Sequence, residues 1–247
     1  MSFFTSAVRL ESTQQHPSAL DEPYDRLART AQVLSTIGCG SKRDADRVTA
    51  RVRALHRSVR GALPEPVGAY LAGASYRADD PELLMWVLFS LADSATVVYR
   101  KYVRSMSRDE QAALWGDYRV VGRLFGPPDD AMPRTLPGLD RYRGEMLGGD
   151  RLYVSDWARQ RARQIVLDAP VPWLARPLLE TVNFITIALL PDRIREQYRF
   201  SPLPPAIVRN ALVNGGAEYV KRAVIPFLPE RLRLVPGRAP PEDLRSP

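Results

Sequence analysis

The sequence has few of the residues that bind metals or form disulfides. Among 247 residues there is one cysteine, Cys39, and there are two histidines, His16 and His56. One cysteine excludes an internal disulfide and the usual cysteine-rich zinc site. The chain also lacks the HExxH, CxxC, GxSxG, P-loop and Rossmann glycine patterns. The sequence therefore contains none of the common motifs for zinc binding, nucleophilic catalysis or nucleotide binding.

Lysine is also scarce, although the chain is basic. It has 35 lysines and arginines against 28 acids, a net charge of +7, and three of the basic residues are lysines. The arginines are spread along the chain and alternate with acids, which is typical of solvated helix faces with local ion pairs. Arginine-rich chains can bind nucleic acid, but no recognition motif or continuous basic stripe is present. We therefore expect no nucleic-acid partner.

Long hydrophobic runs are missing. The most apolar stretches, 83–92 and 184–190, have ten residues or fewer, whereas about 20 are needed to span a bilayer. The N-terminus lacks the basic start and apolar core of a secretory signal. We expect a soluble, cytoplasmic protein without a transmembrane segment, and the sequence does not indicate its oligomeric state.

What the chain does contain is helical periodicity. Apolar residues recur at helical spacing between helix-capping residues and glycine or proline stops, and no strand-like alternation extends beyond a few residues. The sequence predicts an all-α fold in a single domain over residues 23–235, with a flexible segment at 1–22 and a disordered tail at 236–247. The expected helices cover 23–38, 42–61, 81–104, 108–125, 137–147, 156–167, 173–190 and 204–225, with a short helix after Pro191.

The stretch DPELLMWVLFSLADSATVVYRKYVR, residues 80–104, is apolar on every face until Asp93. We expect a central buried helix capped by Asp80. A buried carboxylate needs a partner, and a structural ion pair is a more ordinary role for Asp93 than catalysis. The arginines nearby in sequence are Arg100, Arg104, Arg119 and Arg123.

His56 lies at the edge of the apolar stripe of its expected helix. An imidazole there can ligate a metal or a haem iron through one ring nitrogen. Residue chemistry alone favours a plainer role, an interfacial histidine with one hydrogen bond.

Several motifs, in order along the chain, resemble those of one family. They are HRSVRG at 56–61, YRADDPELLMWV at 76–87, LADSATVVYRKYVR at 91–104, EQAALWGDYRVVGRLFG at 110–126, PWLARPL at 172–178 and TIALLPDRIREQYRF at 186–200. Together they resemble the DUF2236 proteins, also called MpaB-like oxygenases, which are related to latex-clearing rubber oxygenase. The resemblance implies an all-helical, globin-like core that holds haem b around a central buried helix, and an oxygenase-type activity on an apolar small molecule.

The resemblance also shows one departure. Many family members have WVH where this chain reads Trp86-Val87-Leu88, and that histidine is the expected proximal iron ligand. Leucine cannot bind iron, which makes a haem b cofactor doubtful. His56, near the family's distal basic group, is the remaining candidate metal ligand; Met85 is a weaker one. The expected cofactor-binding residues are His56, Arg57, Arg60 and Leu88, and the expected catalytic residues are Arg53, Asp93 and Arg119.

Two functions follow from these observations. The first is an oxygenase-type oxidoreductase with haem held by His56 and an apolar substrate near Trp86, Leu88 and Phe89. The alternative is a degenerate, non-catalytic family member without haem, which binds an apolar ligand or a partner protein. A nucleic-acid-binding helical protein is a third, weaker hypothesis that rests on the basic charge alone.

Overall fold

A computed structural model describes residues 23–64, 66–167, 172–173, 176–200, 205–219 and 222. Within these residues the fold is all-α, as expected, apart from two three-residue strands. The segments 1–22 and 236–247 lie outside the described residues, so their expected flexibility stays a prediction. The elements are α3 (Pro23–Cys39), α4 (Lys42–Ser58), β1 (Arg60–Ala62), β2 (Ser75–Arg77), α5 (Pro81–Tyr102), α6 (Arg108–Phe125), η3 (Asp129–Ala131), α7 (Leu136–Gly148), α8 (Asp156–Val166), α9 (Arg176–Ala188), α10 (Asp192–Tyr198) and α11 (Ala206–Tyr219).

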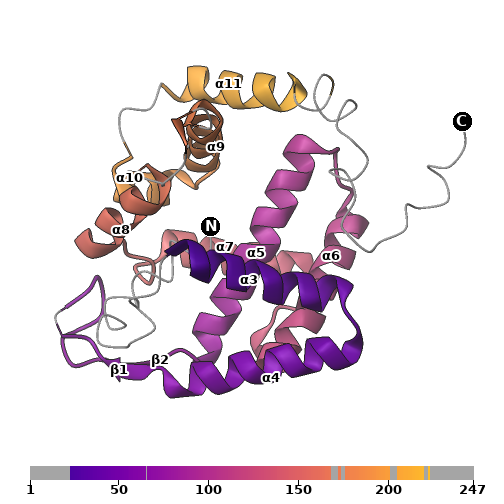
Figure 1. The fold of residues 1–247 in the computed structure, drawn as a ribbon, viewed down its shortest axis with the longest axis vertical. Coiled ribbons are helices and arrows are strands. Elements are labelled where there is room, and N and C mark those ends of the chain that lie inside the picture. The colour runs from indigo at the N-terminus through magenta and orange to yellow at the C-terminus, as the bar shows by residue number, and fades with distance from the viewer. Residues whose placement is uncertain are drawn as a thin grey trace, which may run out of the picture.

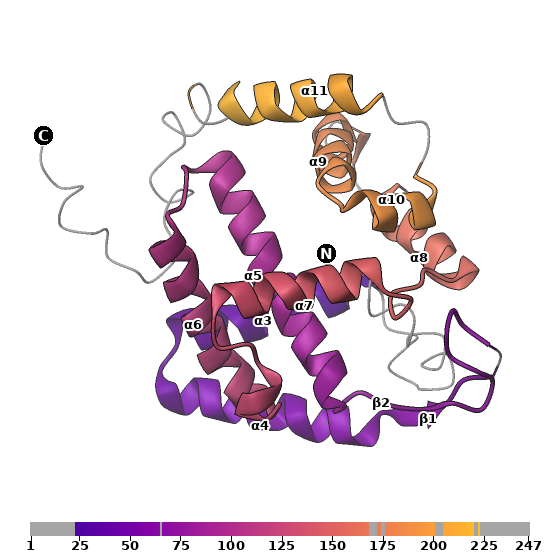
Figure 2. The same cartoon turned by 180° about the vertical axis from the view of Figure 1, so that it is seen from behind.

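The longest helix, α5, runs through the middle of the molecule. Figure 1 shows α3 crossing one side of it, and the reverse view in Figure 2 shows α7 crossing the other side. Helix α6 packs against both α5 and α4, and α11 contacts α5 and α9. The helices from α8 to α11 form a second group at one end of the bundle (Figure 1). The central position predicted for the 81–104 helix is confirmed.

The helix starts follow from short polar residues in the sequence. The Ser41 and Asp80 side chains accept hydrogen bonds from backbone N–H groups in the first turns of α4 and α5. Ser107 and Glu110 form the expected capping box at α6, and Gly126 ends that helix with φ 102°. A positive φ favours glycine, which has no Cβ to clash. These caps occur where the sequence predicted them.

One helix end differs from the expectation. The helix predicted to continue to Gly61 ends at Ser58, and residues 60–62 pair antiparallel with 75–77. A Cβ at Gly61 would lie 2.5 Å from the Tyr76 hydroxyl. The absence of a side chain therefore lets the Tyr76 ring cover this strand. The second strand of this hairpin is followed by Asp79 and Asp80, which directly precede α5.

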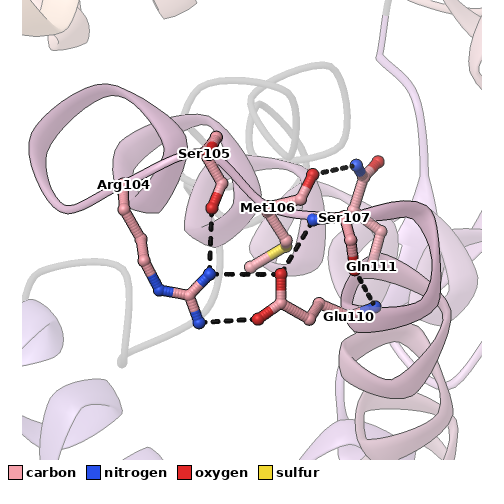
Figure 3. A network of polar contacts seen from close by, with 6 residues as sticks. All are labelled: Arg104, Ser105, Met106, Ser107, Glu110 and Gln111. Carbon is pink, nitrogen blue, oxygen red and sulfur yellow. Dashed lines mark hydrogen bonds and ion pairs between the residues drawn. The ribbon is translucent and has the colours of Figure 1, made fainter.

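The turn between α5 and α6 is held by a network around Glu110 (Figure 3). Arg104 donates to both carboxylate oxygens, at 2.6 and 3.2 Å, and the Ser107 N–H donates at 2.8 Å. The hydrogen bonds from Arg104, followed by that from the Ser107 backbone, lower the pKa of Glu110 to about 2. Arg104 is thus engaged here and is not the partner of Asp93.

Helix α5 is also long and apolar enough to cross a membrane, by length and composition alone. The sequence estimate counted only its apolar first half and so missed this. Core helices meet the same criterion, and α5 contributes Met85, Trp86, Leu88, Phe89 and Ala92 to the main hydrophobic cluster. One such helix is weak evidence for a membrane span, and 33% of its apolar window is buried within the protein.

Candidate functional site

Leu88 is a tightly packed core residue. It is 4% exposed, and it lies against α6 at Gly122 and against Met132, which is 1% exposed. A Cβ built on Gly122 would lie 2.6 Å from Leu88 Cδ2 and 2.7 Å from Met132 Sδ. Glycine at 122 therefore allows these two side chains to approach the α6 backbone. The leucine side chain fills this position with carbon atoms and offers no lone pair to a metal.

His56 lies on the buried face of α4, near the turn that precedes α5. Its Nδ1 is buried and has no hydrogen-bond partner. Burial lowers the pKa of His56, and the charge of Asp79 opposes that change. A lowered pKa keeps the imidazole neutral at neutral pH, the form in which a ring nitrogen has a free lone pair. Nδ1 therefore does not supply the single hydrogen bond of an interfacial histidine, and that role stays a prediction for the other ring nitrogen.

The three arginines around His56 have different surroundings. Arg53, one turn earlier on α4, donates from Nη1 to the carbonyl of Leu124 at 2.8 Å and so binds the C-terminal end of α6. Arg57 and Arg60 are exposed, and Arg60 donates to the Arg57 carbonyl at 2.6 Å. Arg53 therefore ties α4 to α6, while Arg57, in the last turn of α4, and Arg60, in β1, face solvent.

Asp93 has an arginine partner, but not one of the four that the sequence suggested. Its carboxylate lies 3.6 Å from Nε of Arg143 on α7. Burial raises the pKa of Asp93, Arg143 lowers it and Asp140 raises it. The predicted type of interaction is confirmed, and the predicted partners were wrong: Arg104 pairs with Glu110, while Arg119 and Arg123 lie near Asp129.

Arg119 and Arg123 both lie near Asp129 instead. Oδ1 of Asp129 is 3.8 Å from Nη2 of Arg119 and 2.9 Å from Nε of Arg123. Arg119 is largely buried, and its Nε has no hydrogen-bond partner. Among the three expected catalytic residues, Arg119 therefore keeps an uncommitted buried donor, whereas Asp93 is paired and Arg53 holds a helix end.

Replacement of Arg143 by methionine should destabilise the protein at pH 7 by about 1 kcal/mol, since a largely buried carboxylate loses its cation and Arg143 itself is partly exposed. The folded-state pKa of Asp93 is raised. Folding therefore becomes more favourable as pH falls toward the folded-state pKa of Asp93, because Asp93 takes up a proton at a higher pH in the folded state than in the unfolded state. The cost of Arg143→Met should shrink at pH 5. Denaturant unfolding at both pH values measures this.

The matched control is the same substitution in an Asp93→Asn protein, where no charge is left to pair. Arg143→Met should then cost little at either pH. A cost that is equal at pH 5 and pH 7, and unchanged by Asp93→Asn, would contradict the pairing.

Residues 5–222 match the family model described as "ER-bound oxygenase mpaB/B'/Rubber oxygenase, catalytic domain". The match covers most of the 247-residue chain. The chain belongs to this family. The resemblance inferred from the ordered motifs is thereby confirmed, and the family is one of oxygenase catalytic domains. No curated protein and no solved structure gives a significant match. The expected globin-like arrangement of the core stays a prediction.

The family resemblance implies haem b, and the side chains test its fit at two positions. Leu88 does not fit an iron ligand, because it is a packed hydrocarbon side chain. His56 does fit, because its neutral ring carries a buried nitrogen without a partner. Among the described residues, no group of three or more His, Cys, Asp or Glu side chains is arranged to hold a metal ion. Within the described residues, the histidine that a haem could use as its ligand is therefore His56.

Sequence reasoning missed three residues that shape this region: Gly122, Met132 and Arg143. Gly122 lies in the EQAALWGDYRVVGRLFG motif, where a glycine inside a helix signals close packing. Met132 and Arg143 carried no local signal, because their contacts come from α7 and the η3 turn folding back on α5.

Proposed function

We propose that the chain is an oxygenase-type oxidoreductase that acts on an apolar small molecule and holds haem b through His56. Family membership supports the reaction type. The observation that supports His56 as the haem ligand is its buried Nδ1, which has no hydrogen-bond partner and belongs to a ring whose pKa is lowered by burial.

The chain's own residues have separable roles in this proposal. Haem b, when bound, supplies the iron chemistry with which an oxygenase uses dioxygen. His56 keeps a neutral imidazole available as the ligand. Trp86 and Phe89, with ring centroids 5.5 Å apart on α5, belong to the buried hydrophobic cluster, where aromatic rings exclude water and would suit an apolar substrate. Arg119 offers a buried donor, and Arg53 fixes the end of α6 against α4.

One observation favours a second function. Leu88 stands where the resemblance implies a proximal histidine, and its side chain packs closely against α6 at Gly122. Such packing suits a non-catalytic family member that has lost haem and binds an apolar ligand or a partner protein.

The location and partners are also proposals. The family description includes an ER-bound oxygenase, but we propose a cytoplasmic protein without a membrane-spanning segment. The supporting observation is that α5 lies inside the bundle and carries Asp93, whose partner is on α7. Many arginines are engaged in ion pairs with acids on the surface, which supports the absence of a nucleic-acid partner.

The absorption spectrum tests the proposed cofactor. The protein is expressed with haem precursor supplied and compared with His56→Ala and with His16→Ala, which removes the chain's other histidine. We expect a Soret band in the natural protein and in His16→Ala, and its loss or displacement in His56→Ala, because alanine cannot bind iron. Far-UV circular dichroism shows that each variant is folded.

The outcomes separate the two functions. A Soret band that is identical in His56→Ala would overturn the ligand assignment. The lack of a Soret band in the natural protein would overturn the haem proposal and favour the non-catalytic function.

A further inference from the structure

Two arginines are buried where α9, α10 and α11 meet. Arg195 on α10 is 8% exposed, and Arg209 on α11 is 9% exposed. A guanidinium group stays charged in a protein, so each buried arginine needs acceptors for its donors. Nothing in the proposed oxygenase function uses this cluster.

Arg195 has its acceptors. Its Nη1 donates to the carbonyl of Leu190 at 3.0 Å, at the end of α9, and its Nη2 is in contact with the Asp192 carboxylate. Arg195 therefore has a structural role at the corner between α9 and α10.

In the part of the chain that the structure describes, Arg209 has fewer acceptors for its N–H groups than Arg195 has. Its contact with Asp192, 3.7 Å from Nη2 to Oδ1, is its one ion pair within the described residues. Its Nε is buried without a hydrogen-bond partner. A nine-tenths buried guanidinium with one long ion pair is costly, because the donors have left water without gaining acceptors.

Among the described residues, the charges of the cluster are also unbalanced. Arg195 and Arg209 share one ion-paired carboxylate there, and the Asp192 side chain is 76% exposed to water. Burial lowers the pKa of Arg195 and the charge of Arg209 lowers it further, while the exposed Glu196 acts in the opposite direction. The exposure of Asp192 also shows that the cluster reaches the surface at this carboxylate.

We propose that Arg209, beside Arg195, forms a binding site for a small oxyanion, namely a carboxylate or phosphate group of a small molecule. The Nε–Nη edge of a guanidinium donates two parallel hydrogen bonds to such a group. An anion there supplies the acceptor that Nε lacks and neutralises the second arginine. Asp192 competes with the anion for Arg209, so it limits the affinity.

Calorimetric titration of the full chain with inorganic phosphate, and separately with acetate, at constant ionic strength tests the site. We expect saturable binding of at least one of the two probes, and the preferred probe indicates whether phosphate or carboxylate is the natural group. Arg209→Gln should weaken binding of that probe at least about tenfold, because the positively charged guanidinium group and its two parallel N–H donors are lost. The control is Arg176→Gln on α9, an exposed arginine near Glu180, and it should bind like the natural protein.

A second variant keeps the test decisive if Arg209→Gln does not fold. Asp192→Asn removes the competing charge at an exposed position and should tighten binding about fivefold. The proposal is overturned if the natural protein binds neither probe saturably, if folded Arg209→Gln binds as well as the natural protein, or if Asp192→Asn binds no more tightly.

Discussion

Replacement of Leu88 by alanine should lower the free energy of unfolding by about 2–5 kcal/mol. Leu88 is 4% exposed, and its Cδ2 atom, like Met132 Sδ, approaches the α6 backbone at Gly122. Its truncation removes buried methyl groups and leaves a cavity that the surrounding helices fill only in part. Denaturant unfolding at pH 7 measures the loss as a shift in the transition midpoint.

The control for this prediction is Leu71→Ala, which makes the same chemical change at a side chain that is 76% exposed. It should cost no more than about 0.5 kcal/mol. If Leu88→Ala also cost less than about 1 kcal/mol, the space around Leu88 would have to be open. An open space beside α5 would favour a bound cofactor or substrate there over a closed core, so the result bears on function as well as stability.

Local features of the fold could be predicted from sequence because they depend on residues close together in the chain. The caps at Ser41, Asp80 and Ser107 and the stop at Gly126 each involve a side chain or a backbone angle within four residues of a helix end. The apolar run at 83–92 likewise predicts burial of α5, because hydrophobicity on every face leaves no side suited to water.

Contacts between distant parts of the chain could not be predicted in the same way. The sequence indicated that Asp93 needs a cation, and it suggested arginines on α5 and α6. The actual partner, Arg143, lies on α7, and only the path of the chain through η3 places it there. The strand pair 60–62 and 75–77 is similar, because three-residue strands give no detectable alternation.

The candidate site combines both kinds of feature. The sequence motif identified His56 and the departure at Leu88, because each is a single residue within a recognisable pattern. It could not show that Nδ1 of His56 lacks a partner, or that Arg53 is committed to the end of α6. Those properties distinguish a residue that is available for chemistry from one that holds the fold, and they depend on which helix packs beside it.

Replacement of Gly122 by alanine should destabilise the protein by about 1–3 kcal/mol, although alanine is the better helix former. The new Cβ would lie 2.6 Å from Leu88 Cδ2 and 2.7 Å from Met132 Sδ, so both buried side chains must move. Gly116→Ala on the same helix is the matched control, because its Cβ would meet nothing within 4 Å. It should be neutral or stabilise by up to about 1 kcal/mol.

The double variant Gly122→Ala with Leu88→Ala tests whether the clash is with Leu88. Truncation of Leu88 removes the Cδ2 atom that the new methyl group would meet, and that methyl group fills part of the cavity. The two changes should therefore cost less together than the sum of their separate costs, with a coupling of about 0.5–3 kcal/mol. Additive costs would mean that the clash is with Met132 Sδ and that Leu88 is not tightly held against α6. The close packing that now argues against an iron ligand at position 88 would then be lost, and space for a cofactor beside α5 would become the better explanation.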